Sequence, residues 1–201
     1  MRAVTIPHAV PEVFFDAKVP SRSGRGLRLL FVGELSKQKG IDKLLTLHRQ
    51  LSQTNEIMLT VVGDGPLRTL VEQYAQEKFI RYVGRITDRA ELAAEMSAHD
   101  VLILLSQRTP KWEELFGIVL VEAMAAGLGV VASNHIGPRS IFGGAELGNL
   151  FSEDDDAGVS GLLRTLAGSP EALDRFKAAH ARVAARYRSR EVERLWLAIL
   201  G

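Results

Sequence analysis

The feature that most constrains the fold of this chain is a regular alternation of short apolar runs with helical stretches. Five runs are typical of strands buried on both faces, at residues 27–32, 57–62, 80–83, 101–105 and 129–132. Helices are predicted between them, at residues 40–53, 66–78, 88–97 and 117–126. Because parallel strands need long crossover connections, this alternation predicts βαβ units and an α/β fold, a parallel sheet flanked by helices.

The remaining chain completes a doubly wound, Rossmann-like domain. A weaker strand is predicted near residues 147–151, and helices over most of 155–199, with a break at Gly168. After the break, Ser169 is a predicted helix N-cap and Pro170 suits the first turn. Such folds bind ligands beyond the carboxyl ends of their strands. The loops expected there are residues 33–40, 63–66, 84–87, 106–117 and 133–140.

Composition excludes several classes of function. The chain has 201 residues, enough for a sizeable core, and its 25 basic and 24 acidic residues give a net charge of +1 and no polyanion-binding signal. It has no cysteine, so disulfides and thiolate metal sites are excluded. Because the net charge is close to zero, nucleic acid is not an expected partner.

The segment EELFGIVLVEAMAAG, residues 113–127, concentrates the candidate chemistry. Glu114 precedes a Phe-Gly step, and Glu122 follows eight positions later on a helix predicted to begin near Gly117. The first amides of a helix lack intrahelical partners and suit a phosphate group. Carboxylates accept hydrogen bonds from the hydroxyls of a vicinal diol. The segment therefore predicts a nucleotide-sugar site; the plainer alternative is a buried helix with two solvated carboxylates.

In these surroundings the Glu pair resembles that of the retaining glycosyltransferases of family 4 (group 1), and the resemblance covers roughly residues 5–199. It implies that Glu114 contacts the donor sugar and that Glu122 holds the nucleotide ribose. The backbone amides that would meet the diphosphate belong to Phe116, Gly117, Ile118 and Val119.

A second matching segment, FVGELSKQKG, follows the first strand. The segment resembles one in the family that carries a Gly-Arg pair and, five residues on, a Lys-Gly pair. In the family, both pairs bind the diphosphate. Gly33 and Lys39 match, and Lys39 is expected to neutralise phosphate charge and to balance both carboxylates. The Arg position holds Glu34, a charge reversal. It implies a different donor geometry, compensation by Lys37 or Arg85, or weakened activity.

Two further strand-end loops resemble those of the family. VVGDGPLR matches a Gly-acidic-Gly-Pro turn, where a plain turn is favoured over ligand contact by Asp64. YVGRITD resembles the family segment that lines the pocket of the nucleotide base. The resemblance implies that Arg85 and Ile86 lie beside the base. Thr87 or Asp88 is the expected N-cap of the next helix.

Other polar features are assigned structural roles. The acidic run 153–156 lies before a helix, where acids suit the dipole, so solvation is expected rather than metal binding. The five histidines lack metal-ligand spacing, and His135 alone among them deserves a test because it lies on a strand-end loop. The segment 106–112 is expected to be a mobile polar loop. The resemblance implies no cofactor and no essential metal.

The resemblance also predicts the domain organisation. Residues 1–24 are similar to an interdomain linker, and residues 25–201 to the donor-binding domain of a two-domain GT-B enzyme whose N-terminal acceptor domain is absent. The chain is then either a piece of a longer enzyme or a stand-alone half. The tail around Trp196 would expose apolar surface, which favours a homodimer of the isolated domain or poor order of the tail.

The resemblance implies that the whole enzyme transfers a sugar from a UDP-, GDP- or ADP-linked donor to an acceptor with retention of configuration, in polysaccharide or glycoconjugate biosynthesis. Lys39 and Glu114 are the catalytic candidates, with Lys39 stabilising the departing diphosphate. This domain alone is expected to bind without turnover. A cytoplasmic location is expected, with peripheral association at the inner face of the membrane as an option for the full enzyme.

Three alternatives remain open. The first is a non-catalytic or degenerate nucleotide-sugar-binding module, marked by Glu34. The second is half of a GT-B epimerase or phosphorylase, whose relatives lack the Phe-Gly-centred Glu pair. The third is a flavodoxin-like or dinucleotide-binding protein, although the chain lacks a Gly-x-Gly-x-x-Gly after its first strand.

Overall fold

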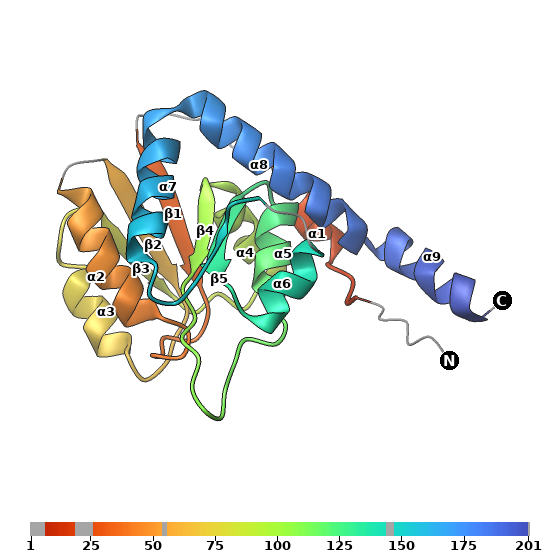
Figure 1. Ribbon diagram of the computed structural model, residues 1–201, viewed down its shortest axis with the longest axis horizontal. Helices are drawn as coiled ribbons and strands as arrows, with labels where there is room; N and C mark the ends of the chain where they lie inside the picture. The colour runs from red at the N-terminus through yellow and green to blue at the C-terminus, as the bar shows by residue number, and fades with distance from the viewer. Residues whose placement is uncertain (1–6, 19–25, 54–55, 144–146, 201) are drawn as a thin grey trace.

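A parallel sheet forms the centre of the molecule (Figure 1). The computed structural model describes residues 7–18, 26–53, 56–143 and 147–200. Within them the sheet has six strands in the order β3-β2-β1-β4-β5-β6, all paired in parallel. The strands are β1 (Leu27–Val32), β2 (Ile57–Val62), β3 (Ile80–Gly84), β4 (Val101–Leu104), β5 (Gly129–Ser133) and β6 (Leu150–Phe151). The predicted α/β class and doubly wound sheet are confirmed.

Helices cover both faces of the sheet. They are α1 (Glu12–Phe15), α2 (Ile41–Ser52), α3 (Arg68–Tyr74), α4 (Arg89–Ser97), α5 (Ile118–Ala125), α6 (Ile136–Phe142), α7 (Asp156–Gly168), α8 (Pro170–Ala184), the 3-10 turn η1 (Ala185–Tyr187) and α9 (Ser189–Leu200). Helix α2 contacts α3 and α7, while α4 contacts α1 and α5. This separation follows from right-handed crossovers, which put helices on opposite faces where the strand order reverses.

Burial along the strands reflects their place in the sheet. The central strands β4 and β5 are buried along their whole length. The expectation that residues 80–83 are also buried on both faces is wrong, because β3 is an edge strand that leaves Arg81 and Val83 exposed. Side chains of an edge strand have a neighbour on one flank only, so part of the strand stays in water.

Helix ends follow the predicted caps in two places. The side chain of Asp88 accepts a hydrogen bond from the amide of Glu91 at 2.8 Å, which selects Asp88 over Thr87 as the N-cap of α4. Ser169 accepts from the amide of Ala172 at 3.1 Å and begins α8. In both cases an oxygen acceptor satisfies an amide that the helix itself cannot pair.

Helix α6 is the main element that the sequence analysis missed, because its residues 136–140 were expected to belong to a loop. Pro138 is the third residue of α6. In the first turn a missing amide hydrogen removes no helical bond, so proline is tolerated there. Helix α3 is shorter than expected and ends at Tyr74.

The amino-terminal segment packs as part of the domain where it is described. Val10 and Phe14 are fully buried, and α1 contacts α4 and α5. The amide of Val10 donates to the carbonyl of Tyr187 at 2.9 Å, which ties this segment to η1. Residues 1–6 and 19–24 of the linker-like segment lie outside the described residues.

Helix α9 extends away from the sheet (Figure 1), and its Trp196 and Leu197 are 52% and 69% exposed. The exposed apolar surface expected around Trp196 is therefore present. Among the helices in the described ranges, none combines the length and apolar character needed to cross a membrane.

The strand order reverses between β1 and β4, which are neighbours in the sheet but not in sequence. The loops that follow these two strands therefore lie side by side. The amide of Gln107 donates to the carbonyl of Gln38 at 2.8 Å. A Cβ atom on Gly40, whose φ is +70°, would lie 1.8 Å from the carbonyl oxygen of Leu105, so only glycine allows this approach. Ligands of doubly wound sheets bind at such a reversal point.

Candidate functional site

Two predicted site residues meet at the reversal point. Lys39 lies in the loop after β1, and its ammonium group contacts the Oε2 atom of Glu114 from the loop after β4. The other oxygen, Oε1, accepts a hydrogen bond from the amide of Gly117 at 3.3 Å. The Lys39 ammonium also lies 5.3 Å from the centre of the Trp112 ring, within range of a cation–π contact. The Glu114 side chain is 9% exposed, so this carboxylate is almost fully enclosed by its partners.

The amino-terminal end of α5 opens to solvent beside this pair. The helix follows Gly117, which has φ +63°, as the sequence predicted. Phe116 and Ile118 are 65% and 41% exposed, and Val119 is half-buried. Within the described chain, no backbone hydrogen bond has the amide of Ile118 or Val119 as its donor. These two amides are therefore available to an anionic ligand.

The second carboxylate, Glu122, lies one turn deeper in α5 and has a different partner. Its side chain is 5% exposed, and its Oε1 atom is 2.5 Å from Nη1 of Arg89 on α4. The expectation that Lys39 balances both carboxylates is therefore wrong, because Lys39 contacts Glu114 and Arg89 contacts Glu122. Arg89 also lies over the ring of Phe14 at 5.6 Å. Sequence reasoning missed Arg89, because the contact joins residues 33 positions apart and no local pattern marks it.

The other predicted donor-binding residues lie on the loops after β1 and β3, and none of their described hydrogen bonds or ion pairs joins them to Lys39, Glu114 or Glu122. Arg85 is exposed and Ile86 half-buried in the loop after β3, and the amide of Gly33 donates to the carbonyl of Val62 at 3.1 Å. Glu34 is exposed, and its carboxylate has no ion pair or hydrogen bond with any side chain in the described ranges. Compensation by Lys37 or Arg85 for the Arg that Glu34 replaces stays a prediction.

The acidic run 153–156 is more closely engaged than expected. Oε1 of Glu153 lies 2.9 Å from Nε2 of His135, so the assignment of Glu153 to a solvated face is wrong. Asp155 caps α7 by accepting from the amide of Gly158 at 2.8 Å, and Asp156 pairs with Lys43 at 2.5 Å. Glu153 and His135 are 18 residues apart in the chain, and no local sequence pattern predicts their contact.

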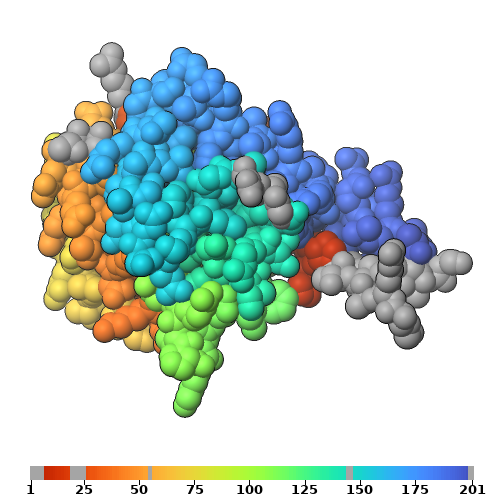
Figure 2. Space-filling model, in the orientation of Figure 1, coloured from red at the N-terminus to blue at the C-terminus, as the bar shows by residue number. Residues whose placement is uncertain are grey.

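The loop between β4 and α5 protrudes from the body (Figure 2), but its own contacts give it a defined turn. Thr109 and Trp112 exchange backbone hydrogen bonds of 2.9 and 3.2 Å. Arg108 pairs with Glu113 at 2.7 Å. Trp112 is half-buried against Lys39, so the loop is not fully exposed at this residue, while its mobility stays a prediction.

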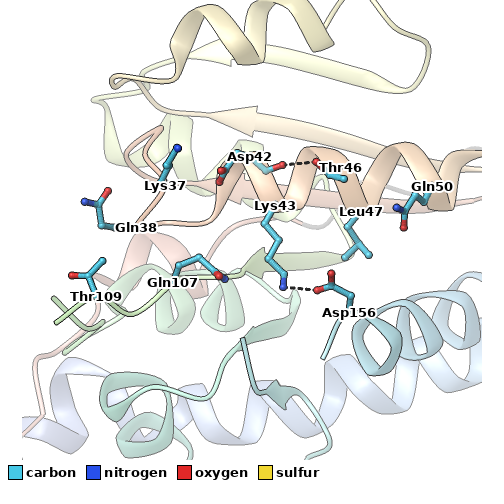
Figure 3. Close-up of a pocket in the computed structure, with 10 residues that line it drawn as sticks. All are labelled: Lys37, Gln38, Asp42, Lys43, Thr46, Leu47, Gln50, Gln107, Thr109 and Asp156. Atoms are coloured by element: carbon cyan, nitrogen blue, oxygen red, sulfur yellow. Dashed lines mark hydrogen bonds and ion pairs between the residues drawn. The ribbon is translucent and has the colours of Figure 1, made fainter. Parts of the chain in front are cut away.

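A hollow of about 580 Å³ lies next to this centre, between α2, the loop after β4 and the start of α7 (Figure 3). Lys43 extends across it from α2 to Asp156. The lining residues are Lys37, Gln38, Asp42, Lys43, Thr46, Leu47, Gln50, Gln107, Thr109 and Asp156. Lys37 alone among them was considered for a role at the diphosphate, and neither Lys39 nor Glu114 lines the hollow, so it adjoins the candidate site without containing it.

Taken together, the centre offers one lysine cation, two free helix amides and two buried carboxylates. The cation and the amides attract a phosphate, and the carboxylates accept hydroxyl hydrogens. In the described part of the chain, no group of three or more His, Asp or Glu side chains is placed to hold a metal ion.

Comparison with known sequences gives a family match over most of the chain. The model of the family described as glycosyl transferases group 1 matches residues 15–183. The phosphatidyl-myo-inositol mannosyltransferase of Mycobacterium leprae is 34% identical over 191 residues, which are 92% of this chain and 50% of that protein. The glycogen synthase of Mycobacterium tuberculosis is 31% identical over 166 residues, which are 80% of this chain and 38% of that protein. The chain thus spans half or less of the length of these relatives.

Solved structures share the fold. WaaG, a glycosyltransferase involved in lipopolysaccharide biosynthesis, has a TM-score of 0.71 at 20% identity and covers 90% of this chain, which spans 51% of it. The C-terminal domain of a group 1 glycosyl transferase family protein (LpcC) from Francisella tularensis has a TM-score of 0.67 at 20% identity. It covers 82% of this chain, which spans 88% of that domain. At such identities the match concerns the fold alone.

Proposed function

Because this chain belongs to the group 1 glycosyl transferases and has the fold of their carboxyl-terminal GT-B domain, we propose that it binds a nucleotide-diphosphate sugar at the crevice between β1 and β4. The whole enzyme would transfer the sugar to an acceptor with retention of configuration. The acceptor-binding half would be a second GT-B domain, and this domain alone would bind without turnover.

The contact between Lys39 and Glu114 is the observation that carries the proposal. It places a cation and an enclosed carboxylate at the sheet's reversal point, next to the free amides of Ile118 and Val119. A diphosphate bound there would receive charge-assisted hydrogen bonds from the lysine and the helix end. A sugar joined to that diphosphate would lie within reach of the Glu114 carboxylate.

Each residue then has a role in the transfer. Lys39 and the α5 amides would stabilise the negative charge that develops on the departing diphosphate. Glu114 would accept hydrogen bonds from the donor sugar, and Glu122 from the ribose, with Arg89 yielding part of its contact with Glu122 to the ribose hydroxyls. Arg85 and Ile86 would flank the base. This charge stabilisation comes from protein groups, and we propose that no metal is essential.

The relatives suggest where such an enzyme acts. One matched protein is a phosphatidyl-myo-inositol mannosyltransferase and another is a glycogen synthase. Both names describe the addition of a sugar to a larger acceptor. We propose that the enzyme containing this chain likewise transfers a sugar to a lipid or a polysaccharide acceptor. A cytoplasmic enzyme that can associate with the inner face of the membrane fits both acceptor classes.

Calorimetric titration with UDP, GDP, ADP and their common sugar conjugates tests the proposal. We expect saturable binding of one base class and its loss in Glu122→Ala. Absence of binding by a folded sample of both this chain and a form that includes the second GT-B domain would refute it.

A degenerate, non-catalytic binding module is the second candidate, and Glu34 is the observation that favours it. Its exposed carboxylate follows β1 without a cationic partner in the described structure, where it would repel a diphosphate. Glu34→Arg discriminates the two. A gain of tenfold or more in diphosphate affinity, about 1.4 kcal/mol, would indicate degeneracy, whereas no gain would indicate a site adapted to Glu34.

A further inference from the structure

We propose that His135 is a positioning residue that holds Glu114 in place only while its imidazole is neutral, which makes the donor site sensitive to acid. The effect on donor binding rests on the proposed function. The switch itself rests on three contacts between the loop after β4 and the start of α6.

The backbone of Glu114 is fixed to α6 from both sides. Its amide donates to Nδ1 of His135 at 3.2 Å, and its carbonyl accepts from the amide of Gly137 at 2.9 Å. Beside it, Glu113 accepts from the amide of Ile136 at 3.0 Å. A Cβ atom on Gly137 would lie 2.6 Å from the carbonyl carbon of Leu115, so this close approach depends on glycine.

The hydrogen bonds determine the tautomer of His135. Because Nδ1 accepts the amide hydrogen of Glu114, Nδ1 carries no proton of its own. The ring proton therefore lies on Nε2, which donates to Oε1 of Glu153 at 2.9 Å. Glu153 is itself fixed, since its Oε2 accepts from the amide of Arg108 at 2.8 Å. His135 is 1% exposed, so water does not replace a lost partner.

Protonation of His135 would break this arrangement. A proton on Nδ1 would face the amide hydrogen of Glu114, so that two donors would oppose each other and the loop would have to move. The Glu114 carboxylate would move with its backbone and lose its geometry against Lys39. Several charged groups surround the ring and its partners. The acids are Glu113, Glu114 and Glu153, and the cations are Lys39, Lys43 and Arg108.

Glu153 is the carboxylate next to the ring, with its Oε1 atom 2.9 Å from Nε2 of His135. Histidine side chains commonly change charge between about pH 5 and pH 8. The site is therefore expected to be formed at the alkaline end of this range and loosened at the acid end.

Trp112 provides a readout that does not depend on any ligand. Its ring lies edge-on to His135 with 6.4 Å between ring centres, and an imidazolium quenches a neighbouring indole. The experiment uses Trp196→Phe as background, so that Trp112 is the sole tryptophan. Its fluorescence should fall with a single titration as the pH is lowered from 8 to 5.5. The matched control His135→Asn keeps an acceptor near the Nδ1 position and cannot titrate, so its fluorescence should stay flat.

The same samples test the consequence for binding. Affinity for the nucleotide sugar, whose diphosphate does not titrate here, should weaken by about fivefold over this range, as expected for the loss of one hydrogen bond. In His135→Asn the affinity should be independent of pH. If no nucleotide sugar binds at any pH, the proposed function fails, while the Trp112 titration still decides the switch.

Two further measurements cover the case in which His135→Asn does not fold. Nitrogen NMR of the wild-type ring at pH 8 should show a protonated Nε2 and a bare Nδ1. In Glu153→Gln the Trp112 titration should shift to lower pH, because the imidazolium loses its carboxylate. A proton on Nδ1 at pH 8, an unshifted titration in Glu153→Gln, or equal titrations in the wild type and His135→Asn would overturn the proposal.

Discussion

The ammonium group of Lys39 contacts the carboxylate of Glu114 although the two residues are 75 positions apart in the chain. The contact joins the loops after β1 and β4, where the order of strands reverses. One residue supplies the positive charge that a diphosphate needs, and the other an enclosed acceptor for hydroxyl groups. The contact between Lys39 and Glu114 therefore brings two separate sequence motifs, around residues 31–40 and 113–127, together in one candidate site.

Removal of the Lys39 cation should weaken diphosphate binding. In Lys39→Ala we expect affinity for the cognate nucleoside diphosphate to fall by about 10- to 100-fold, the range for loss of a hydrogen bond to a charged group. Lys37→Ala is the matched control, since Lys37 is exposed in the same loop and should change affinity by less than about threefold. Equal effects of the two variants in calorimetry would refute the role of Lys39.

Arg89 should stabilise the fold through Glu122. Arg89→Met leaves the buried Glu122 carboxylate without its cation, and we expect a loss of about 1–3 kcal/mol in the free energy of unfolding. The double variant Arg89→Met/Glu122→Met should recover most of this loss, because no unpaired charge remains. The exposed Arg85→Ala serves as control. Urea denaturation compares the wild type, Arg89→Met, Glu122→Met, the double variant and the control, and full additivity of the two single changes would contradict the pairing.

Gly40 should be essential for the crevice. Gly40→Ala combines a φ of +70° with a Cβ atom 1.8 Å from the Leu105 carbonyl oxygen, and we expect it to destabilise the protein by about 2 kcal/mol or more. Gly161→Ala is the opposite control, because its Cβ atom would meet no atom within 4 Å in the middle of α7. That change should raise stability by about 0.5–1 kcal/mol. A thermal melt in which Gly40→Ala matches the wild type would contradict the geometry.

Asp100 should stabilise the fold above acid pH. Burial alone would raise the pKa of Asp100, but hydrogen bonds from the side chain and amide of Arg28 outweigh it and hold this pKa below the usual value. A carboxyl group with a depressed folded pKa contributes stability above its unfolded pKa of about 3.9 and loses it as the pH falls below that value.

In Asp100→Asn we therefore expect a loss of about 3 kcal/mol in unfolding free energy at pH 7 and a smaller loss at pH 3. Asp174→Asn, an exposed change on α8, is the control and should cost less than about 0.5 kcal/mol. Equal losses for Asp100→Asn at the two pH values in urea denaturation would show that the charge of Asp100 contributes nothing.

His99 should make the fold less stable in mild acid. Burial lowers the pKa of His99, whose Nδ1 lies 2.7 Å from the Glu95 carbonyl and whose Nε2 lies 2.8 Å from the Thr60 hydroxyl. In the unfolded chain this histidine binds a proton near pH 6.5, whereas in the folded protein it stays neutral at that pH. The contribution of neutral, buried His99 to the free energy of unfolding is therefore complete above about pH 6.5 and is lost as the pH falls below it. His99→Gln should flatten the decline in melting temperature between pH 7.5 and 5.5. The exposed His8→Gln should leave it unchanged; the reverse result would contradict this account.

The sequence was most informative where structure is local. Short β-rich runs predicted the positions of the strands, because buried parallel strands contain few polar residues. The caps Asp88 and Ser169 followed from hydrogen-bonding chemistry within one turn of helix. Helix α6 was missed because its first residues were assigned to the loop after the fifth strand, and Pro138 is compatible with the helix because it lies in the first turn.

The site was predicted in part. The start of α5 at Gly117 is a local property and was found. That Lys39 would meet Glu114 but not Glu122 depends on which helix packs against α5, which no motif encodes. The contacts of Glu153 with His135, and of Arg89 with Glu122, join segments distant in sequence and require the tertiary structure.

Mapping a bound nucleotide by NMR tests the central claim most directly. The amide resonances of the protein would be followed while UDP, GDP or ADP is added to saturation. The account predicts that one of them shifts the amides of Ile118, Val119 and the loop around Lys39, with smaller changes near Arg85. Shifts confined to the hollow along α2, or saturable binding that leaves the α5 amides unchanged, would contradict it.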